Sequence, residues 1–393
     1  MKAWPTVALA DVAAIERDAV QPEAIEDDTI YVGLENIETG GAFSEVGKVD
    51  AGALASSKFR FSQRHVLYGK LRPYLAKIAC PDFSGICSTD ILPILPGPKM
   101  DRRYFFHYLR QPSMVEYANS RAVGANLPRL GPSVLETFQV PLPPIPDQRR
   151  IAEVLDRAEA LRAKRRAALA QLDALTQAIF LDLFGDPAAN PKGWPRVPFG
   201  ELLTKIDSGW SPICLDRPVT GNEWGILKLG AVTWCEYNPA ENKAMLPDVA
   251  PDPELQIQPG DLLFTRKNTY ELVAACALVQ TTPPRLQMSD LIFRFRLLPD
   301  ADMDACFLHR LLIYPTKRRE IQKLAGGSAG SMPNISKARL QSALIEVPPL
   351  RVQRDFARRV AGVEKLKSAY RASLARLDAL FAVLQYRAFR GEL

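Results

Sequence analysis

The chain has 393 residues, of which 47% are hydrophobic and 24% are charged, and its formal net charge is +6. This length predicts two or three domains, and the composition excludes a chain that is disordered throughout. Six cysteines without a CxxC pair and only three histidines favour neither a disulfide framework nor a zinc site. No charge-free apolar run reaches the ~18 residues of a membrane helix, so we expect a cytoplasmic protein with free thiols.

An internal repeat divides the chain into four parts. Residues 169–175 (LAQLDAL) match residues 374–380 (LARLDAL) at an offset of 205, and the same offset aligns two proline-rich segments that lead to Gln148 and Gln353. A single ungapped offset over roughly fifty residues is poorly explained by chance. We predict four parts in the order head, helix, head, helix: residues 1–146, 147–186, 187–350 and 351–393.

The two heads have diverged more than the segments that follow them, and each predicts a mixed α+β domain. Short β-type runs are separated by turns, and a helical stretch follows late in each head. The predicted strands are residues 30–34, 91–95, 225–229 and 291–295, and the predicted helices are residues 103–117 and 305–324.

The repeated segments predict two long helices. After the first proline-rich lead-in, with Asp147 as a candidate N-cap, nothing breaks helical propensity until Gly185. Apolar residues recur at alternate spacings of three and four, which is typical of a coiled-coil seam. The fold class is therefore α+β, with the two helices paired antiparallel in a pseudo-twofold repeat; the alternative is that each helix packs on its own head. The predicted core of the pair is Ile151, Leu161, Leu172, Leu175, Ile179, Val363, Leu366, Leu377, Leu380 and Leu384.

Catalytic motifs are mostly missing. The sequence has no dinucleotide-binding or phosphate-binding glycine motif, no GxSxG and no HExxH. We interpret the glycine-rich residues 326–330 as a plain loop; the alternative is a loop whose backbone approaches a phosphate. Asp216 with Glu241 and Lys243 matches a metal-nuclease pattern, but that pattern is too permissive to carry weight. We predict no catalytic residue, no metal site and no cofactor in this chain.

Basic residues interleaved with aromatic ones occur in both heads. Arginine and asparagine side chains can pair with base edges, and lysine and arginine neutralise phosphates. A half-buried strand with a solvated face remains an equal alternative for residues 58–61. The candidate DNA-binding residues are Lys58, Arg60, Arg64, Lys70, Arg72, Tyr74, Arg266, Lys267, Asn268 and Tyr270.

These features together resemble the specificity (S) subunit of a type I restriction-modification system. The match rests on two heads alternating with two repeated helices, on the lead-ins VPLPPIPDQ (residues 140–148) and VPPLRVQ (residues 347–353), and on the turn YGKLRPY (residues 68–74). The family usually has Glu-Gln in the lead-in, whereas this chain has Asp147-Gln148 and Val352-Gln353. The second head also has Thr269 where the first has Pro73.

The resemblance implies a DNA-reading subunit without catalysis of its own. Two target recognition domains would each read half of an asymmetric, bipartite site in double-stranded DNA. The paired helices would separate them and bind two methyltransferase subunits, which hold S-adenosylmethionine and methylate adenine N6. Restriction subunits that use ATP and Mg²⁺ would join in some complexes. Two other functions stay open from the sequence: a coiled-coil scaffold with protein-binding heads, and a stand-alone nuclease or methyltransferase.

Overall fold

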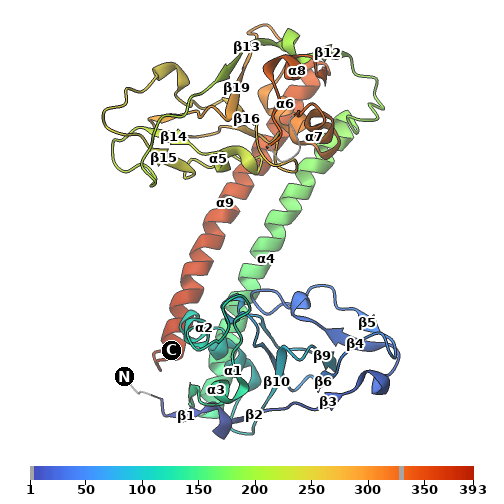
Figure 1. Cartoon of the computed structure of the whole chain (residues 1–393), viewed down its shortest axis with the longest axis vertical. Coiled ribbons are helices and arrows are strands. Elements are labelled where there is room, and N and C mark those ends of the chain that lie inside the picture. Colours follow the sequence, from blue (N-terminus) through green and yellow to red (C-terminus); the bar gives the residue numbers. More distant parts are fainter. Residues whose placement is uncertain (1–3, 327–331) are drawn as a thin grey trace. The chain divides into compact units, whose positions relative to one another are not determined.

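The computed structural model describes residues 4–326 and 332–393, which form two compact units (Figure 1). Unit 1 comprises residues 1–168 and 370–393, and unit 2 comprises residues 169–369. Each unit therefore contains one head together with part of each long helix. Apart from Gly326, the segment predicted to be a glycine-rich loop lies outside the described residues.

The head of unit 1 contains three sheets and three short helices. A five-stranded sheet has the order β3-β6-β9-β4-β5, a four-stranded sheet has the order β2-β10-β7-β8, and β1 pairs with β11. The strands are β1 Thr6–Ala8, β2 Ala13–Ile15, β3 Ala19–Val20, β4 Thr29–Val32, β5 Lys48–Val49, β6 Lys58–Phe61, β7 Val66–Gly69, β8 Ile78–Ala79, β9 Gly85–Cys87, β10 Ile91–Pro96 and β11 Gln139–Pro141. The helices are α1 Arg102–Leu109, α2 Pro112–Asn119 and α3 Pro132–Glu136.

The head of unit 2 is built in a similar way. A four-stranded antiparallel sheet has the order β13-β19-β16-β17, a three-stranded sheet has the order β15-β14-β18, and β12 pairs with β20. The strands are β12 Arg196–Pro198, β13 Leu203–Ser208, β14 Gly225–Leu227, β15 Asn242–Ala244, β16 Leu262–Thr265, β17 Cys276–Leu278, β18 Leu286–Gln287, β19 Ile292–Leu297 and β20 Leu344–Glu346. The helices are α5 Gly230–Thr233, α6 Ala305–Ile313, α7 Pro315–Gln322 and α8 Lys337–Gln341.

The four predicted strands correspond to β4, β10, β14 and β19, whereas each predicted head helix is two helices. Pro112 and Pro315 stand at the first position of the second helix in each case. Proline is tolerated there because its missing N–H would have no partner in the first turn, but it interrupts a continuous helix. Asp101 caps α1 and Asp304 caps α6, each by accepting a hydrogen bond from backbone N–H groups of the first turn.

The long helices are α4, Ile145–Phe184, and α9, Leu350–Ala388. The prediction of Asp147 as N-cap is wrong: α4 begins two residues earlier and Asp147 lies in its first turn. Pro146 does not delay the start, since proline is accepted in the first turn. The predicted end is confirmed, because Phe184 is followed by Gly185 with a φ of +76°.

A buried glutamine fastens each head to its long helix. Gln148 is fully buried; its amide oxygen accepts a hydrogen bond from the N–H of Asp101 (2.8 Å), and its amide nitrogen donates to the carbonyls of Lys99 (2.9 Å) and Pro143 (2.8 Å). Gln353 makes the same three bonds in unit 2, at 2.7–2.8 Å, with Asp304, Asp302 and Pro348. The glutamine that follows each lead-in thus fixes the proline segment and the capping residue of α1 or α6.

Within each unit, α4 and α9 run in opposite directions and touch. In unit 1, Arg162 Nε lies 2.6 Å from Asp378 Oδ1, and the Arg165 guanidinium lies 4.2 Å from the ring centroid of Tyr370. In unit 2, Lys367 Nζ lies 2.7 Å from Asp173 Oδ1, and the rings of Phe180 and Phe356 meet edge to face at 5.7 Å. Higher residue numbers on α4 therefore meet lower numbers on α9 in both units.

Four members of the predicted helix-pair core are exposed: Leu161, Leu175, Leu366 and Leu380, at 53%, 45%, 42% and 50%. The other six are buried or partly buried. The seam instead uses residues one position later, among them Arg162, Thr176 and Lys367, which find partners there. Lys367 and Thr176 are each only 2% exposed. Polar side chains therefore lie in the helix pair next to three of the four exposed leucines.

Among the described residues, one helix has the length and the apolar composition that a membrane span requires, and that helix is α4. The same helix contributes Phe180 and Phe184 to the core of unit 2, where both side chains are almost fully buried. Phe180 and Phe184 therefore pack within the protein, although only 17% of the apolar 18-residue window in α4 is buried.

Candidate nucleic-acid interface

The first turn, residues 70–76, follows β7 and carries three of the candidate residues. Arg72 adopts a left-handed conformation, with a φ of +52°, and its side chain is exposed, as is that of Tyr74 at 51%. The N–H of Arg72 donates to Pro128 O (2.7 Å) and the N–H of Leu130 donates to Lys70 O (2.9 Å). A loop that follows α2 therefore holds the turn in place, so that Arg72 and Tyr74 project from a fixed backbone.

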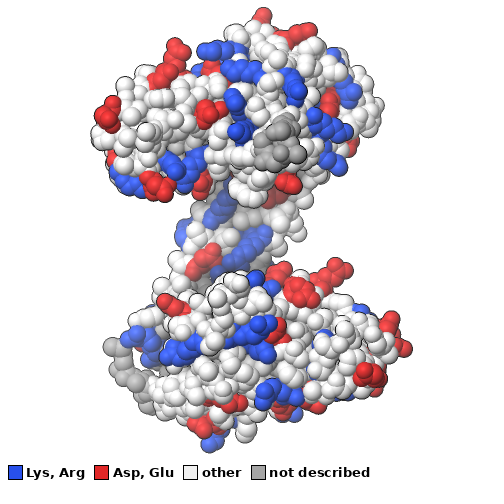
Figure 2. Space-filling model, viewed as in Figure 1, with Lys and Arg blue, Asp and Glu red and all other residues white. Residues whose placement is uncertain are grey.

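Asp90 organises the cations beside the first turn. Its Oδ1 lies 3.2 Å from Arg129 Nε and 3.9 Å from Lys70 Nζ, and the Lys70 side chain is 22% exposed. Arg121, which lies in the same loop as Arg129, stacks over Tyr117 with its guanidinium 3.4 Å from the ring centroid. Figure 2 shows Lys and Arg side chains gathered over α2 on the visible face of unit 1. Arg121 and Arg129 were not predicted from the sequence.

The second turn, residues 266–273, is held by the same pair of backbone bonds. The N–H of Ile335 donates to Arg266 O (2.8 Å), and the N–H of Asn268 donates to Pro333 O (3.4 Å). The repeat aligns Leu127-Pro128 with Met332-Pro333. The carbonyl of the proline in each pair accepts a hydrogen bond from its turn, so the two turns are held in equivalent ways. Tyr270 is 57% exposed at the second turn, and Lys267 is partly exposed.

Two candidate residues, Lys58 and Asn268, use their polar groups in hydrogen bonds within the protein. Lys58 is 6% exposed and donates from Nζ to Ser56 O (2.6 Å) and Ser56 Oγ (2.8 Å), and burial lowers its pKa. Asn268 is also 6% exposed; its Nδ2 donates to Thr233 Oγ1 (3.3 Å) and its Oδ1 accepts from the N–H of Thr269 (2.8 Å). These two side chains stabilise a strand end and a turn.

The remaining candidates are split between elements. Arg60, on β6, and Arg64, in the connection to β7, are exposed. Arg266 packs over Phe293 with its guanidinium 5.3 Å from the ring centroid, and its Nε is buried without a hydrogen-bond partner among the described residues. The structure therefore groups Lys70, Arg72 and Tyr74 in one turn and Arg266, Lys267 and Tyr270 in the other, while Arg60 and Arg64 lie outside both.

Residues 1–171 match the family model described as a type I restriction modification DNA specificity domain. Residues 1–171 are therefore similar to the DNA specificity domain of type I restriction-modification systems. The chain is 34% identical over 203 residues to the EcoEI specificity subunit of Escherichia coli, an alignment that covers 49% of this chain and 34% of that protein. It is 25% identical over 313 residues to the EcoKI specificity subunit of E. coli K12, covering 74% of this chain and 65% of that protein.

Similarity to solved structures extends over the length of the chain. A structure from a study of assembly and conformational transition of the type I R-M system matches with a TM-score of 0.56 and 22% identity, covering 100% of this chain and 98% of that one. The S subunit of the M. genitalium system matches with a TM-score of 0.62 and 12% identity, covering 98% and 96%. These matches show the fold. The chain spans about a third of the first two curated relatives, 34% and 36% of their length.

The specificity-subunit fold places an ionic cluster where α1 packs on α4 in unit 1. Asp156 accepts hydrogen bonds from Arg103 and from His107 Nε2 (2.7 Å), and Arg110 pairs with Glu159 at 3.0 Å. Burial alone would raise the pKa of Asp156, but the bonds from His107 and Arg103 outweigh it and hold that pKa at about 2. Burial lowers the pKa of His107, so its imidazole is neutral near pH 7. This cluster fixes the first head on α4 and has no exposed nucleophile.

The residues that match the metal-nuclease pattern, Asp216, Glu241 and Lys243, are engaged in ion pairs. Lys243 Nζ lies 2.9 Å from Asp216 Oδ1, and Lys228 Nζ lies 3.6 Å from Glu241 Oε2. Among residues 4–326 and 332–393, no group of three His, Cys, Asp or Glu side chains is arranged to hold a metal ion.

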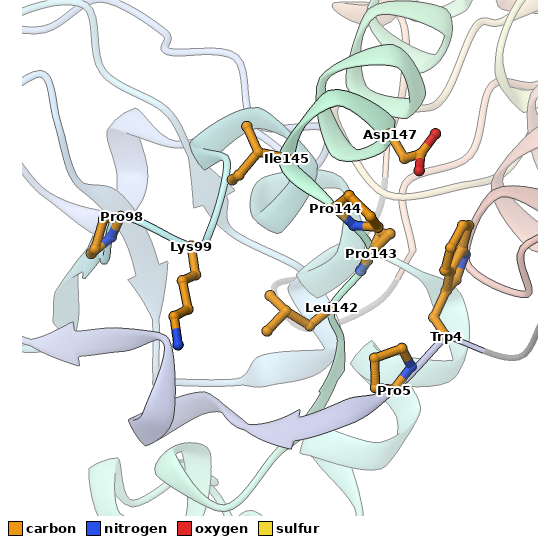
Figure 3. A pocket seen from close by; sticks show the side chains of 9 residues that line it. All are labelled: Trp4, Pro5, Pro98, Lys99, Leu142, Pro143, Pro144, Ile145 and Asp147. Carbon is orange, nitrogen blue, oxygen red and sulfur yellow. The ribbon is translucent and has the colours of Figure 1, made fainter.

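The proline-rich lead-in lines an open pocket of about 560 Å³ beside the start of α4 (Figure 3). In Figure 3, Trp4 stands beside Pro143, Pro144 and Asp147, and Leu142 faces the space between them and Lys99. The lining is mainly apolar, and it contains none of the candidate DNA-binding residues.

Proposed function

We propose that this chain is the DNA sequence-recognition subunit of a type I restriction-modification complex. The observation that carries the proposal is the pair of equivalent turns, each held by a Pro-containing loop and each presenting a different set of basic and aromatic side chains. Arginine and lysine side chains neutralise phosphates, and base edges in the major groove distinguish all four base pairs. Two unlike heads would then read two unlike half-sites.

We further propose that α4 and α9 form one antiparallel coiled coil that acts as a spacer in a pseudo-twofold repeat. The helix contacts inside each unit, such as Arg162 with Asp378 and Asp173 with Lys367, support this arrangement. A spacer of fixed length would set the distance between the half-sites and leave the intervening base pairs unread. The expected target is therefore bipartite and asymmetric.

The exposed leucines of the long helices would bind two methyltransferase subunits. Leu161 on α4 and Leu380, Val383 and Tyr386 on α9 are 50–58% exposed in unit 1. In unit 2, Leu175 and Leu366 are 45% and 42% exposed. Apolar side chains on otherwise charged helices are typical of a partner surface. Those partners would hold S-adenosylmethionine and methylate adenine N6 in the cytoplasm, and restriction subunits with ATP and Mg²⁺ would join where they exist.

The test is a methylation assay with purified components. We expect the chain together with its methyltransferase subunit and S-adenosylmethionine to methylate duplex DNA, and the chain alone to give no turnover with S-adenosylmethionine or Mg²⁺. Turnover by the chain alone would support a stand-alone enzyme. Absence of DNA binding by the assembled complex would support a scaffold whose heads bind proteins.

Exchange of one head tests whether each head reads one half-site. Replacing residues 1–140 by the first head of another specificity subunit should change one half-site and leave the other intact. A change in both half-sites, or in neither, would contradict the assignment of one half-site to each head.

A further inference from the structure

The side chain of Trp234 is 75% exposed. No other aromatic residue among the described residues of unit 2 is more exposed. It follows α5, and the residue after it, Cys235, has a φ of +62°. A left-handed conformation is costly for a residue other than glycine, so the surrounding structure must hold this backbone in place. The sequence offered no pattern around Trp234 that points to a function.

One backbone contact and two side-chain contacts hold the residues on either side of Trp234. His309 Nε2 donates to Cys235 O (3.3 Å), and Arg318 lies 3.5 Å from Cys235 Sγ. Burial lowers the pKa of His309 to about 4, so the imidazole is neutral near pH 7 and donates from Nε2. On the other side, Thr233 is 7% exposed and accepts the hydrogen bond from Asn268 in the second turn.

Asn268, Arg318 and Gln322 connect the backbone segments that carry Trp234 and Tyr270. Asn268 stands two residues before Tyr270, and Gln322 Nε2 donates to the carbonyls of Tyr270 (3.2 Å) and Val273 (3.1 Å). Arg318 also donates to Leu272 O (3.1 Å). Two exposed aromatic side chains are therefore carried by neighbouring backbone segments that α6 and α7 hold rigid.

Exposed cations lie near these aromatic residues, together with two exposed acids, Glu236 and Glu271. Arg318 and Gln322 face the second turn from α7, and Arg319 and Lys323, the residues that follow them, are exposed. Lys and Arg side chains gather over α7 and α8 on the face of unit 2 seen in Figure 2. Of the nearby acids, Glu320 is paired with Lys317 at 3.0 Å. Aromatic planes next to cations are the combination that binds sugars and bases along a phosphate backbone.

We propose that Trp234 and Tyr270 contact the DNA half-site that unit 2 reads, with the indole packed against deoxyribose and base edges while Lys267 and Arg319 neutralise flanking phosphates. This inference rests on the proposed function and adds a residue that the sequence did not single out. An exposed tryptophan loses little freedom on binding because it has two rotatable side-chain bonds, and it buries a large area.

Beside the first turn of unit 1, Thr39 Oγ1 donates to Leu75 O (3.0 Å), and Gly40 and Gly41 follow it. Because Trp234 lies in the head of unit 2, loss of the indole should affect the half-site that unit 2 reads and leave the other unchanged.

The experiment uses the assembled complex of the full chain with its methyltransferase subunit. The variants are W234A, W234F and Y270A, with W210A as the matched control, because Trp210 is also exposed, at 37%, and lies in the segment after β13. DNA affinity is measured by fluorescence anisotropy on duplexes with a wild-type target, with one altered half-site, or with the other.

We expect W234A to weaken DNA binding at least ten-fold and Y270A to weaken it several-fold, while W234F keeps most of the affinity and W210A matches the wild type. Discrimination against an altered base should fall only in the half-site read by unit 2. Thermal unfolding should be unchanged, since the indole is exposed.

Three results would overturn the proposal. W234A could bind DNA as tightly and as selectively as the wild type, or it could lose both half-sites equally. It could also lose the methyltransferase subunit in size-exclusion chromatography, which would make Trp234 a protein contact. If the wild-type complex itself fails to bind DNA, the proposed function fails and this inference falls with it; a wild-type complex that binds normally separates the two cases.

Discussion

The spacer hypothesis makes a prediction whose size follows from helix geometry. Seven residues inserted after Ala168 in α4, with seven inserted after Ala369 in α9, fall between the Arg165–Tyr370 contact of unit 1 and the Asp173–Lys367 contact of unit 2. A heptad keeps the seam facing its partner on both helices. At about 1.5 Å per residue the pair lengthens by about 10 Å.

Base pairs in B-DNA are about 3.4 Å apart, so the gap between the half-sites should widen by about three base pairs while both half-sites stay the same. The assay is methylation of a duplex series whose gap varies one base pair at a time, by complexes containing the wild-type or the extended chain. An insertion in α4 alone is the control; it breaks the register of the pair and should abolish selective methylation. An unchanged optimum gap in the doubly extended chain would show that the helices do not set the spacing.

Four further predictions concern individual side chains. Q148A removes the hydrogen-bond partner of three backbone groups, one of them in a buried bond, and should lower the free energy of unfolding by about 1–3 kcal/mol in urea titrations, whereas Q171A, at an exposed site on α4, should have almost no effect. Arg294 and other donors outweigh the burial of Asp207 and hold its pKa at about 2, below the ordinary 3.8. The resulting stabilisation, about 2 kcal/mol, should be complete above pH 4, should disappear as the pH falls toward 2, and should be absent in D207N. The double variant L161E/L380E should weaken methyltransferase binding at least ten-fold in calorimetry without changing the unfolding midpoint. The control I213E, on the second head, should leave methyltransferase binding unchanged. Equal binding by the double variant and the wild type would exclude these leucines from the interface. R72A should weaken binding of the complex to all DNA sequences alike. The slope of log affinity against log salt concentration should become smaller by about 0.9. A loss of affinity that depends on the DNA sequence would show that Arg72 contacts a base instead.

The order of elements could be predicted because its signals are local. Prolines and Gly185 mark the limits of α4, and the offset of 205 by itself relates Gln148 to Gln353. The function of these glutamines could not be predicted, since their partners include Lys99 and Asp302, about fifty residues earlier in the chain.

The seam of the helix pair shows why apolar periodicity was insufficient. Two series, one through Leu161 and one through Arg162, both follow spacings of three and four, and the leucine series contains more apolar residues. The structure buries members of both series: Ile151 and Val363 of the leucine series are 2% and 9% exposed, while Arg162, Thr176 and Lys367 of the other series find partners across or along the helices. The leucines left outside are the residues that a partner would cover.

The positions of the two turns followed from the sequence, but the burial of individual candidate side chains did not. The recurrence of a basic turn after a β run located residues 70–76 and 266–273. Burial of Lys58 and Asn268 depends on Ser56 and Thr233, which no pattern links to them. Trp234 lies outside the segments that the repeat aligns at the offset of 205, so the repeat could not point to it.

The central claim is that two unlike heads on one pair of helices read two separate stretches of DNA. The most direct measurement is the sequence motif methylated in genomic DNA by this chain together with its methyltransferase subunit, mapped by single-molecule sequencing. We predict two short, different half-sites separated by a gap of unspecified bases with one fixed length. A continuous motif, a palindrome or a gap of variable length would contradict the account.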